Sequence, residues 1–180
     1  METKEKINIT VQTIVYAPVE KTWKLWTSPE HITQWNNASP DWHTPRAEND
    51  LRAGGKFLSR MEAKDGSFGF DFWSVYKDIQ PNKSLSLEMG DGRSWDIQFE
   101  SNGNETKVTE VFEAEQTNPI EMQRGGWQMI LNNFKPWERL SRHSQKLIIF
   151  EIRQFASKYL ISKRLLVLLS CCGEQDIITY

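Results

Sequence analysis

The fold is decided by residues 55–112, which have the sequence GKFLSRMEAKDGSFGFDFWSVYKDIQPNKSLSLEMGDGRSWDIQFESNGNETKVTEVF. Apolar and polar side chains alternate here in short runs, which Gly, Asn, Asp and Pro interrupt at regular spacing. Such alternation is typical of half-buried strands, and Asp-Gly between two runs is typical of a tight hairpin turn. Because strands joined by short turns are antiparallel neighbours, the stretch predicts a five-strand antiparallel meander.

The second run of the meander has two faces of different chemistry. Phe68, Phe70 and Phe72 alternate with Asp71 and Trp73, so the two sets must point to opposite sides of the sheet. The five runs are Phe57–Met61, Phe68–Val75, Leu85–Met89, Trp95–Phe99 and Val108–Phe112.

Residues before the meander predict one further strand and two short helices. Apolar residues occupy alternate positions of Ile7–Tyr16, which brings the sheet to about six strands. Pro18 suits the first position of a helix, and Ser28-Pro29 marks the start of another, because serine caps a helix and proline fits its first turn. Residues 36–52 are polar, contain two prolines and predict a loop.

Residues after the meander predict a long helix. Asn118 is expected to cap it and Pro119 to be its first residue. Gly125-Gly126 is unfavourable in a helix by roughly 1 kcal/mol per glycine, so the pair predicts a bend or close packing on a strand. An apolar stripe with helical spacing must face the sheet. Its residues are Trp127, Ile130, Leu131 and Phe134.

Composition excludes several classes of protein. Hydrophobic residues make up 38% and charged residues 26%, as in ordinary globular proteins. The net charge of −2 argues against a nucleic-acid partner. No apolar run follows the first charged residues, so no secretory signal is visible and a cytoplasmic location is expected. The only two cysteines, Cys171 and Cys172, are adjacent, which excludes a disulfide framework.

Several short stretches, in the same order, resemble a known family. The chain is similar to the START/Bet v 1-like (SRPBCC) superfamily with the helix-grip fold, in the branch related to the activator of Hsp90 ATPase. The resemblance covers residues 7–135 and implies an α+β fold in which a curved antiparallel sheet wraps around the long C-terminal helix, with two short helices after the first strand. The stretches that carry it are Ala17-Pro18-Val19-Glu20-Lys21-Thr22-Trp23, Ser28-Pro29-Glu30-His31-Ile32-Thr33-Gln34-Trp35, Asp50-Leu51-Arg52-Ala53-Gly54-Gly55-Lys56-Phe57, Asp91-Gly92-Arg93 and Gly126-Trp127-Gln128-Met129-Ile130-Leu131-Asn132-Asn133-Phe134-Lys135.

The resemblance ends at Lys135. Pro136 would remove a helical hydrogen bond and clash with the carbonyl of Asn132, so the helix is expected to end or kink there. All eight tryptophans lie at or before Trp137. We therefore divide the chain into a helix-grip domain of the ligand-binding type at residues 1–137 and an additional C-terminal tail at residues 138–180.

The tail has no counterpart in the family, and three interpretations of it stay open. Gln145–Leu169 contains a rough helical stripe of apolar residues that charges interrupt, which makes it a poor membrane span. It is an accessory helix packing on the domain or on a partner, a non-native extension such as a shifted reading frame, or a basic amphipathic helix at a membrane surface.

A bent sheet and one amphipathic helix, both rich in bulky groups, cannot fill all the space between them. We therefore expect an apolar cavity with few polar points, the usual site for a small hydrophobic molecule. Asp71 and Glu110 are the candidate polar anchors, because an acid in an apolar cavity must be paired, neutralised or used. A solvent edge for the acids, and plain core packing for the tryptophans, are the alternatives. The candidate lining residues are Trp35, Trp42, Met61, Asp71, Trp73, Trp95, Ile97, Phe99, Glu110, Phe112, Trp127 and Ile130.

Signals for catalysis are few. His31, His43 and His143 are far apart, and none has a second histidine or a cysteine at metal-ligand spacing. Asp41-Trp42-His43 is the only cluster of an acid and a histidine, and an exposed loop explains it. The sequence has no phosphate-binding loop and no nucleophile elbow. We predict no catalytic residue, no metal and no cofactor.

Three functions follow from the sequence and the resemblance. The first is a non-catalytic domain, monomeric or homodimeric, that binds an unidentified small hydrophobic molecule as a sensor or carrier. The second, which the resemblance implies, is a module that contacts an Hsp90-type chaperone. The third is an enzyme of the aromatase/cyclase or hydratase kind that uses the same cavity, since one fold hosts many functions.

Overall fold

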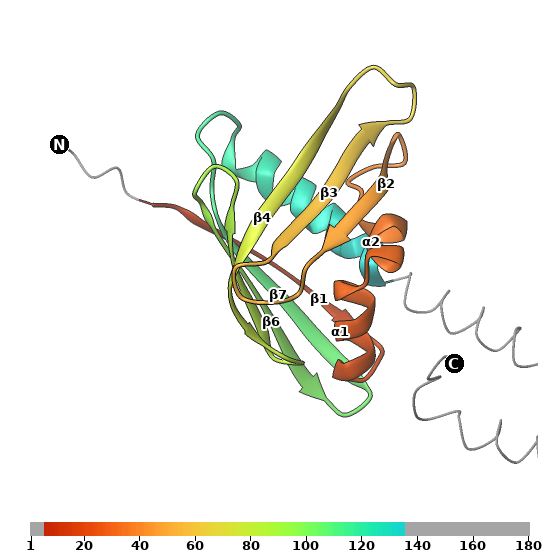
Figure 1. The fold of residues 1–180 in the computed structure, drawn as a ribbon, viewed down its shortest axis with the longest axis vertical. Helices are drawn as coiled ribbons and strands as arrows, with labels where there is room; N and C mark the ends of the chain where they lie inside the picture. The colour runs from red at the N-terminus through yellow and green to blue at the C-terminus, as the bar shows by residue number, and fades with distance from the viewer. Residues whose placement is uncertain (1–5, 136–180) are drawn as a thin grey trace, which may run out of the picture. The chain divides into compact units, whose positions relative to one another are not determined.

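The computed structural model describes residues 6–135 of the chain, as a sheet, two short helices and a long helix (Figure 1). The long helix begins at residue 120 and continues to the last described residue, 135. The predictions for Pro136, for the tail at 138–180 and for the two cysteines lie outside the described residues. The other elements are β1 (Asn8–Val15), α1 (Val19–Thr27), α2 (Pro29–Trp35), β2 (Trp42–Asn49), β3 (Lys56–Ala63), β4 (Gly69–Gln80), β5 (Ser84–Met89), β6 (Ser94–Asn102) and β7 (Glu105–Glu113).

The sheet has seven antiparallel strands in the order β1-β7-β6-β5-β4-β3-β2. The five predicted strands of the meander are β3 to β7, and each pairs with the next. The first strand, β1, pairs with the last, so β1 and β2 lie at opposite edges. The helices α1 and α2 connect these two edges, and the sheet curves around the long helix (Figure 1). The helix-grip prediction is therefore confirmed.

The expectation of about six strands and of a loop at residues 36–52 needs correction, because β2 lies in that segment. This strand pairs with β3 alone, and its register shifts between His43 and Arg46. Pro45 lies at the shift, and a strand at the edge of a sheet tolerates proline because one side of its backbone needs no partner. The polar, proline-containing sequence of an edge strand has little alternation and therefore gave no strand signal.

The core lies between the inner face of the sheet and the helices. The apolar faces of α1 and α2 are buried, including Trp26, Ile32 and Trp35. On the long helix, Leu131 and Phe134 are fully buried. The Phe134 ring lies 4.9 Å from the ring of Trp26 and 4.9 Å from that of Trp35, in edge contacts. The apolar stripe of the helix therefore faces the core, as predicted.

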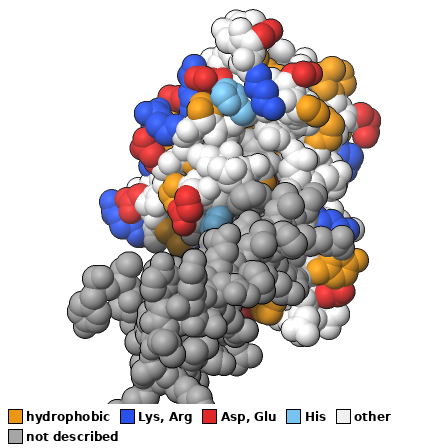
Figure 2. Space-filling view, turned by 90° about the vertical axis from the view of Figure 1, so that its right-hand side faces the viewer, with side chains coloured by type: hydrophobic (Ala, Val, Ile, Leu, Met, Phe, Trp, Pro, Cys, Tyr) orange, Lys and Arg blue, Asp and Glu red, His pale blue; other side chains and the backbone are white. Residues whose placement is uncertain are grey.

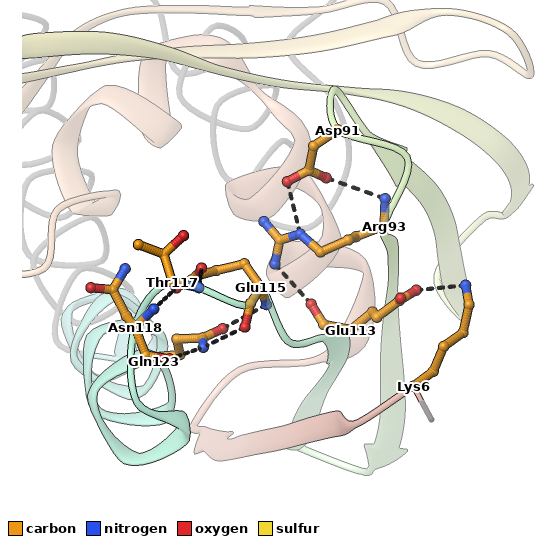
Figure 3. Close-up of polar contacts among 8 residues, drawn as sticks. All are labelled: Lys6, Asp91, Arg93, Glu113, Glu115, Thr117, Asn118 and Gln123. Atoms are coloured by element: carbon orange, nitrogen blue, oxygen red, sulfur yellow. Dashed lines mark hydrogen bonds and ion pairs between the residues drawn. The ribbon is translucent and has the colours of Figure 1, made fainter. Parts of the chain in front are cut away.

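A network of hydrogen bonds fixes the start of the long helix (Figure 3). Gln123 accepts a bond from the Glu115 backbone N–H at 2.9 Å and donates to the carbonyls of Glu115 at 3.0 Å and Asn118 at 2.8 Å. The Glu115 carboxylate accepts bonds from the backbone N–H groups of Thr117 and Asn118, which lowers the pKa of Glu115. The helix begins one residue after Pro119, and the N–H groups that Glu115 binds belong to the turn before the helix.

The long helix also covers the free edge of β1. The Gln128 side chain accepts a bond from the Gln12 backbone N–H at 3.3 Å and donates to the Gln12 carbonyl at 3.1 Å. Arg124 donates to the Thr10 carbonyl at 3.2 Å. These bonds satisfy backbone groups that an edge strand would otherwise present to another chain.

The Gly125-Gly126 pair is not explained by close packing. The helix is continuous through both residues, and a Cβ atom built at either position meets no atom within 4 Å. The predicted close packing of these glycines on a strand is therefore wrong.

Charges on the described surface are mixed in sign. Figure 2 shows acidic and basic side chains interspersed on one face, without a broad field of one sign. Within residues 6–135, no helix is long and apolar enough to cross a membrane.

Candidate functional site

A pocket of about 160 Å³ lies in the interior of the domain, between the helices and the inner face of the sheet. The long helix contributes Trp127 and Ile130, and the short helices contribute Trp26 and Trp35. The strands supply most of the remaining wall. Of the eleven lining residues, only Asn36 and Glu110 are polar. The others are Trp26, Trp35, Phe57, Met61, Phe70, Phe72, Trp95, Trp127 and Ile130.

The register of β7 places Glu110 in this pocket. Val108, Glu110 and Phe112 alternate along the strand and are all at most 2% exposed. Glu110 pairs with Val11 of β1 on one side and with Ile97 of β6 on the other. An acid therefore occupies a position where the neighbouring positions of the same face are apolar.

Glu110 has one hydrogen-bond partner among the described residues. Trp95 Nε1 donates to Glu110 Oε2 at 2.9 Å. Burial, which disfavours the charged form, raises the pKa of Glu110 to about 8, and the bond from Trp95 acts in the opposite direction. The carboxyl is therefore mostly protonated at neutral pH.

The second polar lining residue, Asn36, is held in place by its neighbours. Its Nδ2 donates to Ser59 Oγ at 2.9 Å, and its carbonyl accepts a bond from the Thr44 hydroxyl. Both partners are buried. These two bonds hold Asn36 at the end of α2 and join that helix to β2 and β3.

A second, more open hollow of about 450 Å³ borders the pocket. Met61, Phe70, Trp127 and Ile130 line both. The hollow also includes Trp42 and the exposed side chains of Met122 and Met129. The centroid of the Trp42 ring lies 6.2 Å from that of Phe68 and 6.0 Å from that of Phe70. An apolar surface thus leads from the pocket toward solvent.

The candidate residues divide among several places in the fold. Six line the pocket: Trp35, Met61, Trp95, Glu110, Trp127 and Ile130. Trp42 lines the bordering hollow instead. Ile97, Phe99 and Phe112 are buried core residues outside the pocket wall. Phe112 supports the wall, because its ring stacks on Trp127 with 3.9 Å between centroids and 17° between planes.

Asp71 and Trp73 do not belong to the pocket. They occupy the outer face of β4, whereas Phe72, Ser74 and Tyr76 point inward. Asp71 lies 3.5 Å from the Arg60 guanidinium. The Trp73 ring lies where a Cβ atom of Gly90 would be, and the Lys56 ammonium is 4.7 Å from its centroid. Period-two alternation separates two faces but does not tell which face meets the helix.

Five lining residues were not among the candidates. Phe57 shares a strand face with Met61, and Phe70 and Phe72 share a face, so alternation could have found all three once one inward residue was known. Trp26 lies on the buried face of α1. Asn36 gave no signal, because it ends α2 within the segment expected to be a loop.

The two histidines among the described residues, His31 and His43, do not line the pocket. His43 Nε2 lies 3.7 Å from Glu62 Oε2 across the β2–β3 pair, and both side chains are exposed. Burial lowers the pKa of His31. Among residues 6–135, no group of three His, Cys, Asp or Glu side chains could hold a metal ion. His143 lies outside the described residues.

The chain is similar in sequence and in fold to known proteins. The model of a family described as "Activator of Hsp90 ATPase homolog 1-like protein" matches residues 16–136. The solution structure of an AHSA1-like protein from Aeromonas hydrophila is 40% identical, with a TM-score of 0.71, over 75% of this chain and 94% of that one. The protein Chr148 from Cytophaga hutchinsonii is 48% identical, with a TM-score of 0.65, over 76% of this chain and 94% of that one.

A more distant structure shares the fold alone. CalU16 from Micromonospora echinospora is 18% identical, with a TM-score of 0.57, over 81% of this chain and 86% of that one. The search among curated proteins gives no match.

Proposed function

The chain belongs to the Activator of Hsp90 ATPase homolog 1-like family, and we propose that its domain is a non-catalytic module that binds one small hydrophobic molecule in the interior pocket. The observation that carries this proposal is the pocket wall, where nine of eleven residues are apolar and the single ionisable group is the buried Glu110. Ligand pockets in proteins have this composition, a mostly apolar wall with a few polar groups that orient the ligand.

The size of the pocket supports a small ligand. A dry apolar cavity of about 150 Å³ is large enough to bind benzene. The pocket has about 160 Å³, and the bordering hollow provides room for a longer body that extends from it. A molecule with one aromatic ring, or an aliphatic group of similar size, therefore fits the interior part.

Native mass spectrometry of freshly purified protein tests the proposal, because a ligand that occupies the pocket would copurify. A calorimetric titration with ethylbenzene gives an independent test. Ile130→Trp should fill the pocket and weaken binding at least about tenfold. Asn132→Trp places the same side chain on an exposed position of the same helix and should leave binding unchanged. If wild-type protein neither carries a small molecule nor binds ethylbenzene, the proposal fails.

Contact with an Hsp90-type chaperone is the second candidate function. The description of the family favours it, and so do the exposed apolar side chains of Phe68, Phe70 and Met122. Exposed apolar patches commonly mark interaction surfaces. Such a partner should co-elute with the protein in size-exclusion chromatography, and the protein should raise its ATPase rate. Ser substitutions of Phe68 and Met122 should reduce both effects.

An enzyme remains the third candidate, with Asp71, Glu110 and His43 as its possible acids and bases. Of these, Glu110 alone lines the pocket. A lone carboxyl with a pKa of about 8 could act as a general acid, yet the described pocket wall contains no second ionisable group to complete the reaction. A binding function needs only the groups that line the pocket, whereas catalysis would need a second ionisable group that the described wall does not contain.

A further inference from the structure

Glu110 is the only ionisable residue on the buried face of β7, which it shares with Thr106, Val108 and Phe112. Val108 and Phe112 flank it on β7, and the residues paired with it are Val11 and Ile97. Glu110 is 2% exposed, so a charge on it would be almost entirely removed from solvent. A core position needs no carboxyl for packing, since a leucine or methionine would fill it at lower cost in desolvation.

One carboxyl oxygen of Glu110 is satisfied and the other is not. Oε2 accepts the hydrogen bond from Trp95 Nε1 at 2.9 Å. Among the described residues, Oε1 has no hydrogen-bond partner, and none of the other ten residues that line the pocket is ionisable. They come from α1, α2 and its C-terminal Asn36, β3, β4, β6 and the long helix, so no cation faces the carboxyl from any of these elements.

The protonated carboxyl has a defined polarity. An ionised carboxylate with one hydrogen bond and no cation is unfavourable in an apolar interior, so the group is neutral, in agreement with the raised pKa of Glu110. Because Oε2 accepts from the indole N–H, the proton lies on Oε1, which is then an O–H donor without an acceptor. The chemical complement of this group is an uncharged acceptor atom on the ligand.

We propose that Glu110 is the recognition group of the pocket and that it selects apolar ligands carrying one carbonyl oxygen, to which its Oε1 donates a hydrogen bond. This inference rests on the proposed binding function and adds the class of ligand. An anionic ligand would find no cation in the pocket wall. A ligand with a protonated amine would require the ionised carboxylate instead, and the experiment distinguishes that case.

The test compares three probes of similar size: acetophenone, ethylbenzene and 1-phenylethylamine. Calorimetry measures the affinity of each for the full chain, and the ratio of acetophenone to ethylbenzene affinity isolates the carbonyl from the shared apolar body. Replacing Glu110 by Leu should lower this ratio about tenfold at pH 6.5, the size expected for one net hydrogen bond. Glu110→Gln should preserve it, because an amide accepts from Trp95 and still donates to the ligand.

The pH dependence of wild-type protein gives a second test that needs no variant. As the pH rises from 6.5 to 9.5, Glu110 ionises and loses its donor, so the ratio should fall about tenfold. It should stay constant in Glu110→Gln and Glu110→Leu, which have no group that titrates in the pocket.

The possible results separate the two proposals. If ethylbenzene binds but the ratio is the same in wild type and Glu110→Leu, or the same at both pH values, the role of Glu110 is wrong and the binding function stands. If only 1-phenylethylamine loses affinity on replacement of Glu110, the ligand class is wrong. If neither neutral probe binds wild-type protein, the binding function itself fails, and this inference fails with it.

Discussion

Trp95 and Glu110 form a hydrogen bond of 2.9 Å between neighbouring strands in the interior of the domain, and it is the only bond that either side chain makes within the described residues. Trp95 of β6 pairs with Phe112, two residues beyond Glu110 on β7, so the two side chains lie diagonally on the same face. A large aromatic group thus provides both a wall of the pocket and the one donor that a buried acid has.

The stability of the protein should depend on pH through Glu110. Its pKa of about 8 in the folded state exceeds the ordinary value of 4.5, so the folded state holds the proton between these two pH values and the unfolded state does not. The free energy of unfolding therefore decreases as pH rises from about 4.5 to about 8, by roughly 1.4 kcal/mol per pH unit from this group, and the effect is complete above that range.

Urea denaturation of wild type and Glu110→Gln at pH 5, 7 and 9 checks this expectation. The variant keeps an acceptor for Trp95 Nε1 but cannot ionise. Relative to wild type it should gain stability with rising pH, by about 4 kcal/mol between pH 5 and pH 9. A stability difference that does not change between pH 5 and pH 9 would show that Glu110 is not buried in its neutral form.

Replacing Gln123 by Ala should destabilise the domain by about 2–3 kcal/mol, because the buried side chain makes three hydrogen bonds to the backbone before the long helix. Met122→Ala is the matched control. Its side chain is 63% exposed, so the substitution should change the free energy of unfolding by no more than about 0.5 kcal/mol. Equal losses in thermal denaturation for both variants would contradict the anchoring role of Gln123.

Gly125→Ala should stabilise the protein by about 0.5–1 kcal/mol. The residue lies within the helix, its φ is not positive, and a Cβ atom there meets nothing within 4 Å. Gly92→Ala should have the opposite effect, because Gly92 has a φ of 87° in the turn before β6. Differential scanning calorimetry of the two variants should give melting temperatures on opposite sides of the wild-type value. A lower melting temperature for Gly125→Ala would mean that the glycine is needed for a purpose other than packing.

Much of the fold was predictable because its signals are local. Alternation gave β1 and β3 to β7, and the capping and proline patterns gave α1, α2 and the long helix within a residue or two. The strand β2 was not predictable, since an edge strand with Pro45 and a register shift carries no alternation. Its existence depends on pairing with β3, which comes later in the chain.

The candidate site was predictable only in part. Glu110 stood out as an acid between Val108 and Phe112, and the apolar stripe of the long helix included Trp127 and Ile130. Asp71 could not be separated from these in advance. Its strand carries bulky residues on both faces, so composition alone did not distinguish the inner from the outer face.

By itself, the sequence determined the periodic elements, their order and the residues that share each face, because these depend on neighbours within a few positions. The tertiary structure decided which face of β4 meets the long helix, which strand forms the second edge, and that Trp95 reaches Glu110. These depend on the curvature of the sheet and on the register between strands, which combine contributions from residues far apart in the sequence, such as Asn8 and Glu113 of the β1–β7 pair. The volume of the pocket also depends on the tertiary structure. It is the volume that the sheet and the long helix enclose, less the volume of the side chains that point into it.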